Sequence, residues 1–139
     1  MLDFNGTLAV DGRLIPDVKP RLATLARSLR IHVVTADTFG RARASLRDVQ
    51  CTLEVLTPGG EDRAKERYVR RLGKRAVACI GNGRNDRLML RAAALGIATV
   101  QREGAAAETL EAADIVVRDV RDALDLLLAP RRLVATLRS

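Results

Sequence analysis

The chain has 139 residues, of which 47% are hydrophobic, 29% charged and 2% aromatic. This length suits one domain with its own core, and the composition excludes a disordered or low-complexity chain. The net charge is +7, but the 24 basic residues are spread along the chain and over five of the six predicted helices. We therefore interpret them as a solvated arginine-rich surface, and nucleic acid is not expected as a partner.

Short apolar segments alternate with amphipathic segments along nearly the whole chain. The apolar segments predict strands at residues 31–35, 53–56, 76–80, 96–100 and 115–117. The amphipathic segments predict helices at residues 18–30, 38–48, 62–72, 86–95, 105–112 and 120–128. Gly73 and Gly96 are expected to end helices. The alternation predicts an α/β fold, a three-layer Rossmann-like parallel sheet with helices on both faces.

A small β-hairpin is expected before the first of these helices. Residues 8–10 and 13–15 flank the pair Asp11-Gly12, which suits a two-residue turn that needs positive φ angles. The hairpin would form a flap directly after a polar motif near the start of the chain.

The cellular compartment is predicted from the absence of membrane-spanning segments, of a signal peptide and of metal-binding cysteines in the sequence. No apolar stretch approaches the length of a membrane-spanning helix, and no signal peptide opens the sequence. Cys51 and Cys79 have no metal-ligand spacing, so free thiols in a reducing compartment are expected. These features predict a cytoplasmic protein without a membrane partner.

Four polar features are candidates for chemistry, because open parallel sheets bind ligands where their strands end. They are Leu2-Asp3-Phe4-Asn5-Gly6-Thr7, Val34-Thr35-Ala36-Asp37, Lys65 and Gly81-Asn82-Gly83-Arg84-Asn85-Asp86. Each alone is equally typical of a structural role: a turn cap, a helix cap, a solvated lysine or a loop. Their combination is more specific than any one of them.

In this order and spacing the four features resemble the motifs of the haloacid dehalogenase-like (HAD) superfamily, in particular small capless members related to the phosphorylation domain of P-type ATPases. The first motif of that superfamily is Asp-x-Asp-x-Thr, or Asp-Lys-Thr-Gly-Thr in the ATPases, where this chain has Asp3-Phe4-Asn5-Gly6-Thr7. The resemblance covers residues 1–139 as a single HAD-like core. No cap domain is expected, because neither interval between the motifs has room for one.

The resemblance implies a Mg²⁺-dependent phosphohydrolase or phosphotransferase that works through an aspartyl phosphate. Asp3 would be the nucleophile, and Lys65 would neutralise both Asp3 and the transferring phosphoryl group. Thr35 would donate its hydroxyl to a phosphate oxygen, and Gly6 would let the backbone come close to the phosphate. Asn5 stands where phosphatases of the superfamily have their general acid and base.

The metal ligands implied by the resemblance are Asp3, the backbone carbonyl of Asn5, Asn82 and Asp86. Asn82 replaces an acidic residue of the family motif, which lowers the negative charge around Mg²⁺. Since an amide is neither an acid nor a base, Asn5 predicts low turnover. The alternative hypothesis is a catalytically weak or inactive module that binds Mg²⁺, phosphate or a partner protein. A polyanion-binding role is a third hypothesis.

Several nearby residues are expected to be structural. Asp37 precedes a predicted helix and is interpreted as its cap, and His32 as a satisfied histidine of the core or sheet edge. Arg84 and Arg87 flank the acidic motif and are weaker candidates for contact with an anionic substrate.

An open, capless site suits a phosphorylated small molecule or a phosphoprotein, and a second copy of the chain could act as a lid. The chain begins two residues before Asp3. The first strand of the sheet is therefore expected to be truncated, with its neighbours poorly paired, unless the true start lies upstream.

Overall fold

A parallel sheet lies at the centre of the computed structural model, which describes residues 1–37 and 40–138. Its strands are β3 (His32–Thr35), β4 (Thr52–Val55), β5 (Ala78–Gly81), β6 (Leu95–Thr99) and β7 (Ile115–Val117). β3 pairs with β4, β5 with β6 and β6 with β7, in each case parallel. The five predicted strands are confirmed, with ends shifted by at most two residues.

Residues 1–3 join the two parts of this sheet. Leu2 forms parallel bridges to Val33 of β3 and to Ile80 of β5. Its N–H donates to the carbonyl of His32 at 2.8 Å, and the N–H of Asp3 donates to the carbonyl of Ile80 at 3.0 Å. These residues pair with both neighbours, and Asp3 stands at the carboxyl edge in the middle of the sheet.

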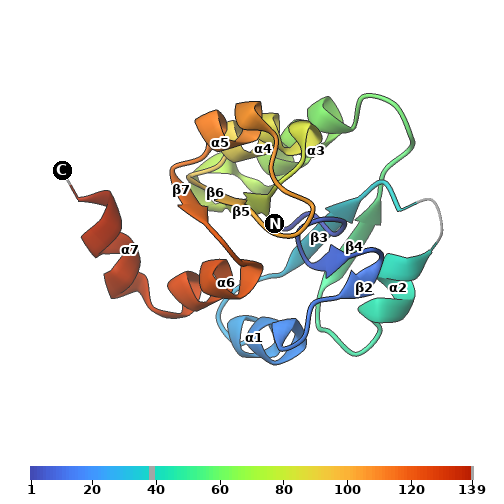
Figure 1. Cartoon of the computed structure of the whole chain (residues 1–139), viewed down its shortest axis with the longest axis horizontal. Helices are drawn as coiled ribbons and strands as arrows, with labels where there is room; N and C mark the ends of the chain where they lie inside the picture. The colour runs from blue at the N-terminus through green and yellow to red at the C-terminus, as the bar shows by residue number, and fades with distance from the viewer. Residues whose placement is uncertain (38–39, 139) are drawn as a thin grey trace.

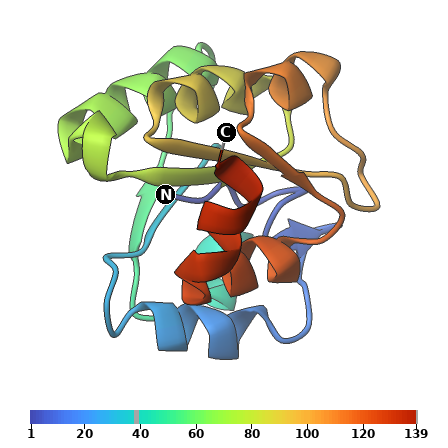
Figure 2. The ribbon, with the colours of Figure 1, turned by 90° about the vertical axis from the view of Figure 1, so that its left-hand side faces the viewer.

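Helices cover both faces of the sheet, which confirms the expected three layers (Figures 1 and 2). α1 (Val18–Leu25) and α6 (Val120–Leu128) pack together on one face, and the opposite face carries α3 (Glu61–Leu72), α4 (Arg87–Ala92) and α5 (Ala107–Ala112). A separate apolar core fills each interface. No helix in the described part of the chain is long and apolar enough to cross a membrane.

The expected flap is present, and no cap domain interrupts the described residues. β1 (Ala9–Val10) pairs antiparallel with β2 (Arg13–Leu14), and both turn residues between them have positive φ. The helix predicted at residues 38–48 is observed as α2 (Arg41–Ser45), and its first two residues lie outside the described part of the chain. Two 3-10 turns, η1 (Lys74–Ala76) and η2 (Arg84–Asp86), complete the core.

Gly96 was expected to end a helix, and this expectation is wrong. The helix α4 ends earlier, at Ala92, and Gly96 lies inside β6. A Cβ atom on Gly96 would stand 2.8 Å from the carbonyl oxygen of Leu90, so the missing side chain lets α4 approach the strand. Gly73 does end α3, with φ +92. The helix α7 (Pro130–Leu137) was not predicted and projects from the body in Figure 1.

Candidate active site

A buried lysine joins two carboxylates at the carboxyl edge of the sheet. Lys65 extends from α3, and Asp86 is the last residue of η2. Asp3 directly follows Leu2, which pairs with both β3 and β5. The Nζ atom of Lys65 donates to Oδ1 of Asp3 and to Oδ1 of Asp86, both at 2.6 Å. All three side chains are buried, and Lys65 and Asp86 have no exposed surface. We call Asp3, Lys65 and Asp86 the carboxylate–lysine cluster.

Burial and mutual repulsion set the charge state of this cluster. Burial, together with the negative charge of Asp86, raises the pKa of Asp3 to about 7, although Lys65 acts in the opposite direction. Burial alone would lower the pKa of Lys65, but the two carboxylates outweigh it and raise that pKa well above its usual value. One ammonium group therefore neutralises two carboxylates incompletely, and the cluster favours a further positive charge.

Asp86 is held in place by the loop that precedes it. Its Oδ2 accepts hydrogen bonds from the backbone N–H groups of Asn82 and Gly83, both at 2.9 Å. A Cβ atom on Gly81 would lie 2.5 Å from Cγ of Asp86. Glycine at position 81 thus allows the carboxylate to fold back against the end of β5, where it meets Lys65.

The remaining predicted residues surround the cluster without all contacting it. Thr35 is buried at the end of β3, the strand that pairs with residues 1–3. Asn5 is exposed in the loop after Asp3. Gly6 has φ +78, and a Cβ atom there would stand 2.5 Å from Nδ2 of Asn82. The first and last motifs are therefore in direct contact through Gly6 and Asn82.

Asn82 uses both of its polar side-chain atoms to hold loops together. Its Oδ1 accepts from the hydroxyl of Thr7 at 3.1 Å, and its Nδ2 donates to the carbonyl of Gly104 at 3.0 Å. The role of Asn82 as a metal ligand stays a prediction. The geometry gives this side chain a clamping role between the loop after Asp3 and the loop after β6.

Gln101 is a second connector, and the sequence analysis missed it. Its Nε2 donates to the carbonyls of Gly6 and Thr7, both at 2.8 Å, and its Oε1 accepts from the N–H of Val120 at 2.8 Å. The side chain links the loop after Asp3 to the first turn of α6. Gln101 lies outside the recognised motifs, and bonds to backbone groups leave no pattern in the sequence.

The donors near the cluster fit Mg²⁺ better than a metal that needs several protein ligands. No group of three or more His, Cys, Asp or Glu side chains that could hold a metal is found among the described residues. Mg²⁺ commonly takes one or two carboxylates and completes its shell with water and phosphate oxygens. Asp3 and Asp86 supply two carboxylates that meet at one ammonium group, and their incomplete neutralisation suits a cation.

The residues expected to be structural have structural partners. Asp37 accepts from the N–H of Ala42 in the first turn of α2 at 2.8 Å, which confirms its capping role. The Nδ1 atom of His32 lies at hydrogen-bond distance, 3.0 Å, from the hydroxyl oxygen of Tyr68. Arg84 and Arg87 form ion pairs with acidic side chains of α5 and α3, at 3.1 and 2.8 Å, and their contact with an anionic substrate stays a prediction.

Sequence comparison identifies a relative in an archaeon. The chain is 46% identical over 84 residues to the uncharacterized protein MJ0073 of Methanocaldococcus jannaschii, and the match covers 58% of this chain and 90% of that protein. No family model matches the chain.

Solved structures with the same fold include phosphatases and an ion pump. The 3-deoxy-D-manno-octulosonate 8-phosphate phosphatase of Moraxella catarrhalis, crystallised with magnesium, phosphate and KDO, is similar with a TM-score of 0.73 at 18% identity, covering 99% of this chain and 91% of that one. A zinc-transporting PIB-type ATPase has a TM-score of 0.71 at 24% identity, covering 91% of this chain and 20% of the ATPase. At these identities the likeness establishes the fold.

Proposed function

We propose that this chain, which belongs to the family of MJ0073 and has the fold of the haloacid dehalogenase superfamily, is a Mg²⁺-dependent phosphohydrolase or phosphotransferase. In the proposed reaction it forms an aspartyl phosphate on Asp3. The observation that carries this proposal is the contact of one buried ammonium group with Asp3 and Asp86 at 2.6 Å, at the carboxyl edge of the sheet. Burying three charged groups costs desolvation free energy and adds little to stability, which supports a functional role for this contact.

In the proposed reaction a carboxylate oxygen of Asp3 attacks the phosphorus atom of the substrate. The bond from phosphorus to the leaving oxygen breaks, and that oxygen takes the electron pair and a proton from water. Lys65 offsets the negative charge of Asp3 and of the phosphoryl group, which lets the two approach. Thr35, at the end of the adjacent strand, donates its hydroxyl to a phosphoryl oxygen.

Asp3, Asp86 and the backbone carbonyl of Asn5 would hold Mg²⁺. When bound, the ion supplies positive charge that lowers the repulsion between the Asp3 carboxylate and the phosphate. The raised pKa of Asp3 supports this assignment, because an added cation favours the ionised carboxylate that the attack requires.

The second half of the reaction is the slow half in this proposal. Hydrolysis of an aspartyl phosphate needs a base to take a proton from water, and the amide of Asn5 cannot act as one. Transfer of the phosphoryl group, or a long-lived phosphorylated state, therefore suits this chain better than rapid hydrolysis. A phosphorylated small molecule or a phosphoprotein is the proposed donor, with a second copy of the chain as a possible lid.

Asn82 favours a second candidate function. Its oxygen accepts from Thr7 and its amide donates to Gly104, so its hydrogen-bonding groups hold loops together. With Asn5 as the other neutral replacement, the same cluster would suit a module that binds Mg²⁺ and phosphate, or a partner protein, and turns over little or nothing.

Phosphorylation of Asp3 tests the leading proposal. The purified chain is incubated with acetyl phosphate and Mg²⁺, and the aspartyl phosphate is measured by intact mass and by its sensitivity to hydroxylamine. We expect an adduct of roughly 80 Da, the mass of one phosphoryl group, that is absent with a chelator and in Asp3→Asn. The matched control, Asp122→Asn at an exposed position of α6, should label normally. Equal labelling of Asp3→Asn and the wild type would contradict the proposal.

The variant Asn5→Asp separates the two candidate functions. An aspartic acid at this exposed position can protonate the leaving group, and the carboxylate that results can then take a proton from water, so hydrolysis of the phosphorylated chain should accelerate by about 10²- to 10⁴-fold. The rate is followed as release of inorganic phosphate. If the wild type is labelled and Asn5→Asp releases phosphate no faster, the binding module becomes the better account.

A further inference from the structure

The helix α7 extends from the body of the molecule and leaves most of its surface in solvent. None of its residues is buried, and both ribbon views show it on the side of the molecule where β7 forms the edge of the sheet (Figures 1 and 2). Leu133 packs against the core and so fixes which side of the helix faces the body. The other side of α7 and the nearby edge of the sheet form an outer surface of the molecule.

Exposed apolar side chains are concentrated on these elements. Val134 is 66% exposed and Leu137 is 47% exposed, and their spacing of three residues makes them neighbours on the surface of α7. Val116 of β7 and Leu128 of α6 are exposed as well. Four of the seven exposed large hydrophobic side chains in the described part of the chain thus belong to β7, α6 and α7. Contiguous apolar surface of this kind is typical of an interaction site.

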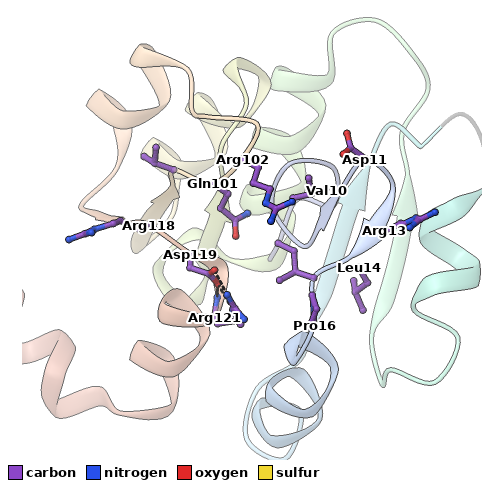
Figure 3. Close-up of a pocket in the computed structure, with 12 residues that line it drawn as sticks. Val10, Asp11, Arg13, Leu14, Pro16, Gln101, Arg102, Arg118, Asp119 and Arg121 are labelled. Carbon is purple, nitrogen blue, oxygen red and sulfur yellow. Dashed lines mark hydrogen bonds and ion pairs between the residues drawn. The ribbon is translucent and has the colours of Figure 1, made fainter.

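Arginines without carboxylate partners accompany these apolar side chains. Arg131 and Arg138 lie three and four residues from Val134, so both are its neighbours on the helix surface. In the close-up of the hollow beside the flap, the guanidinium group of Arg118, which follows β7, points outward and away from the flap (Figure 3). No ion pair joins these three arginines to a described carboxylate. Asp125 is the last acidic residue in the sequence, so α7 carries positive charge without a negative residue of its own.

This combination of charge and apolar surface narrows the kind of occupant. A second copy of the chain would bring two sets of arginines together at α7, which like-charge repulsion opposes. A nucleic acid would match the arginines but would leave Val134 and Leu137 in water. An anionic bilayer suits both features, because its phosphate groups attract arginines and its headgroup–acyl boundary takes up apolar side chains.

We propose that α7, with the adjacent edge of the sheet, docks this protein on a membrane surface that carries anionic lipids. The helix lies in the plane of the interface, which requires no membrane-spanning segment. Val134 and Leu137 enter the headgroup–acyl boundary, and the guanidinium groups of Arg131 and Arg138 bind lipid phosphate oxygens in pairs. None of these residues belongs to the carboxylate–lysine cluster, so docking does not depend on the proposed reaction at Asp3.

Sedimentation with lipid vesicles tests the proposal. The purified chain is mixed with vesicles of phosphatidylcholine that contain roughly 30% phosphatidylglycerol, and with vesicles of phosphatidylcholine alone. We expect binding to the anionic vesicles that weakens as salt is added, and binding to the neutral vesicles that is at least about tenfold weaker. The double variants Arg131→Gln/Arg138→Gln and Val134→Gln/Leu137→Gln should each lower affinity for the anionic vesicles by at least about tenfold.

Matched variants on other surfaces serve as controls. Arg27→Gln/Arg47→Gln removes the same charge from exposed positions, and Leu29→Gln/Val55→Gln removes apolar side chains that are 45% and 47% exposed. Each should change affinity by less than about twofold. Because no residue of α7 is buried, its variants should unfold in urea at the wild-type midpoint, so their effect on binding reports the surface itself.

Three results would overturn the proposal. The first is equal binding to neutral and anionic vesicles, or no binding to either at low salt. The second is equal weakening by the α7 variants and the controls, since net charge or general apolarity would then govern binding. The third is a different occupant of the same surface. A dimer in size-exclusion chromatography that both α7 variants abolish would assign it to a second copy, and binding of duplex DNA that only the arginine variant weakens would assign it to nucleic acid.

Discussion

Asp3 is held in surroundings that favour its protonated form until another cation joins the site. Burial and the charge of Asp86 raise its pKa to about 7, against a usual value of 3.8. A carboxyl group with a raised pKa binds its proton more tightly in the folded chain than in the unfolded chain. Between about pH 4 and pH 7 the folded chain therefore holds the extra proton, and the contribution of Asp3 to the free energy of unfolding falls as pH rises.

The variant Asp3→Asn should remove this pH dependence. At pH 5 the wild-type side chain is mostly neutral, so the two chains should differ by less than about 1 kcal/mol. At pH 8, with a chelator present, the wild type pays for a buried charge, and the variant should be more stable by about 1–4 kcal/mol. Urea unfolding at both pH values measures the difference, with Asp122→Asn as the control. The same difference at both pH values would show that Asp3 does not titrate in this range.

At the scale of elements, regular strands were predictable and contacts between loops were not. β3, β5 and β6 are buried on both faces and appear in the sequence as short apolar runs. Gly96 was misassigned because a glycine that ends a helix and a glycine that lets a helix approach a strand look alike in sequence. The helix α7 was missed because none of its residues is buried. The order of the motifs predicted the residues of the carboxylate–lysine cluster. That the cluster is buried, and that Lys65 contacts both Asp3 and Asp86, became known only from the structure.

The loop connections make a testable contribution of their own. Gln101→Ala removes the partners of the carbonyls of Gly6 and Thr7 and of the N–H of Val120. Unsatisfied, partly buried polar groups cost about 1–3 kcal/mol, and water can replace some of the lost bonds. We expect the free energy of urea unfolding to fall by that amount. The matched variant Gln50→Ala, at an exposed position, should change it by less than about 0.5 kcal/mol, and equal effects would refute a connecting role for Gln101.

The whole molecule depends on a very short central connection. Residues 1–3 lie between β3 and β5, so the two parts of the sheet meet through a few backbone bonds and the apolar core around them. The same connection carries Asp3 to the edge where Lys65 and Asp86 arrive from α3 and η2. Assembly of the candidate active site and cohesion of the sheet therefore rest on the same few residues.

Leu2→Ala tests this dependence, because its side chain is 4% exposed and belongs to the core that contains Phe4 and Leu22. Truncating a buried leucine costs about 2–5 kcal/mol, and the backbone bonds of residue 2 are unchanged. If residues 1–3 bind both parts of the sheet into one cooperative unit, urea unfolding stays a single transition with a lower midpoint and the same slope. Amide exchange protection should then fall equally at Val34 and Ile80, whose N–H groups donate to the carbonyls of Leu2 and Met1. The control Leu29→Ala, at a side chain that is 45% exposed, should shift the midpoint little. Loss of protection at Val34 while Ile80 keeps it would mean that the two parts of the sheet unfold independently.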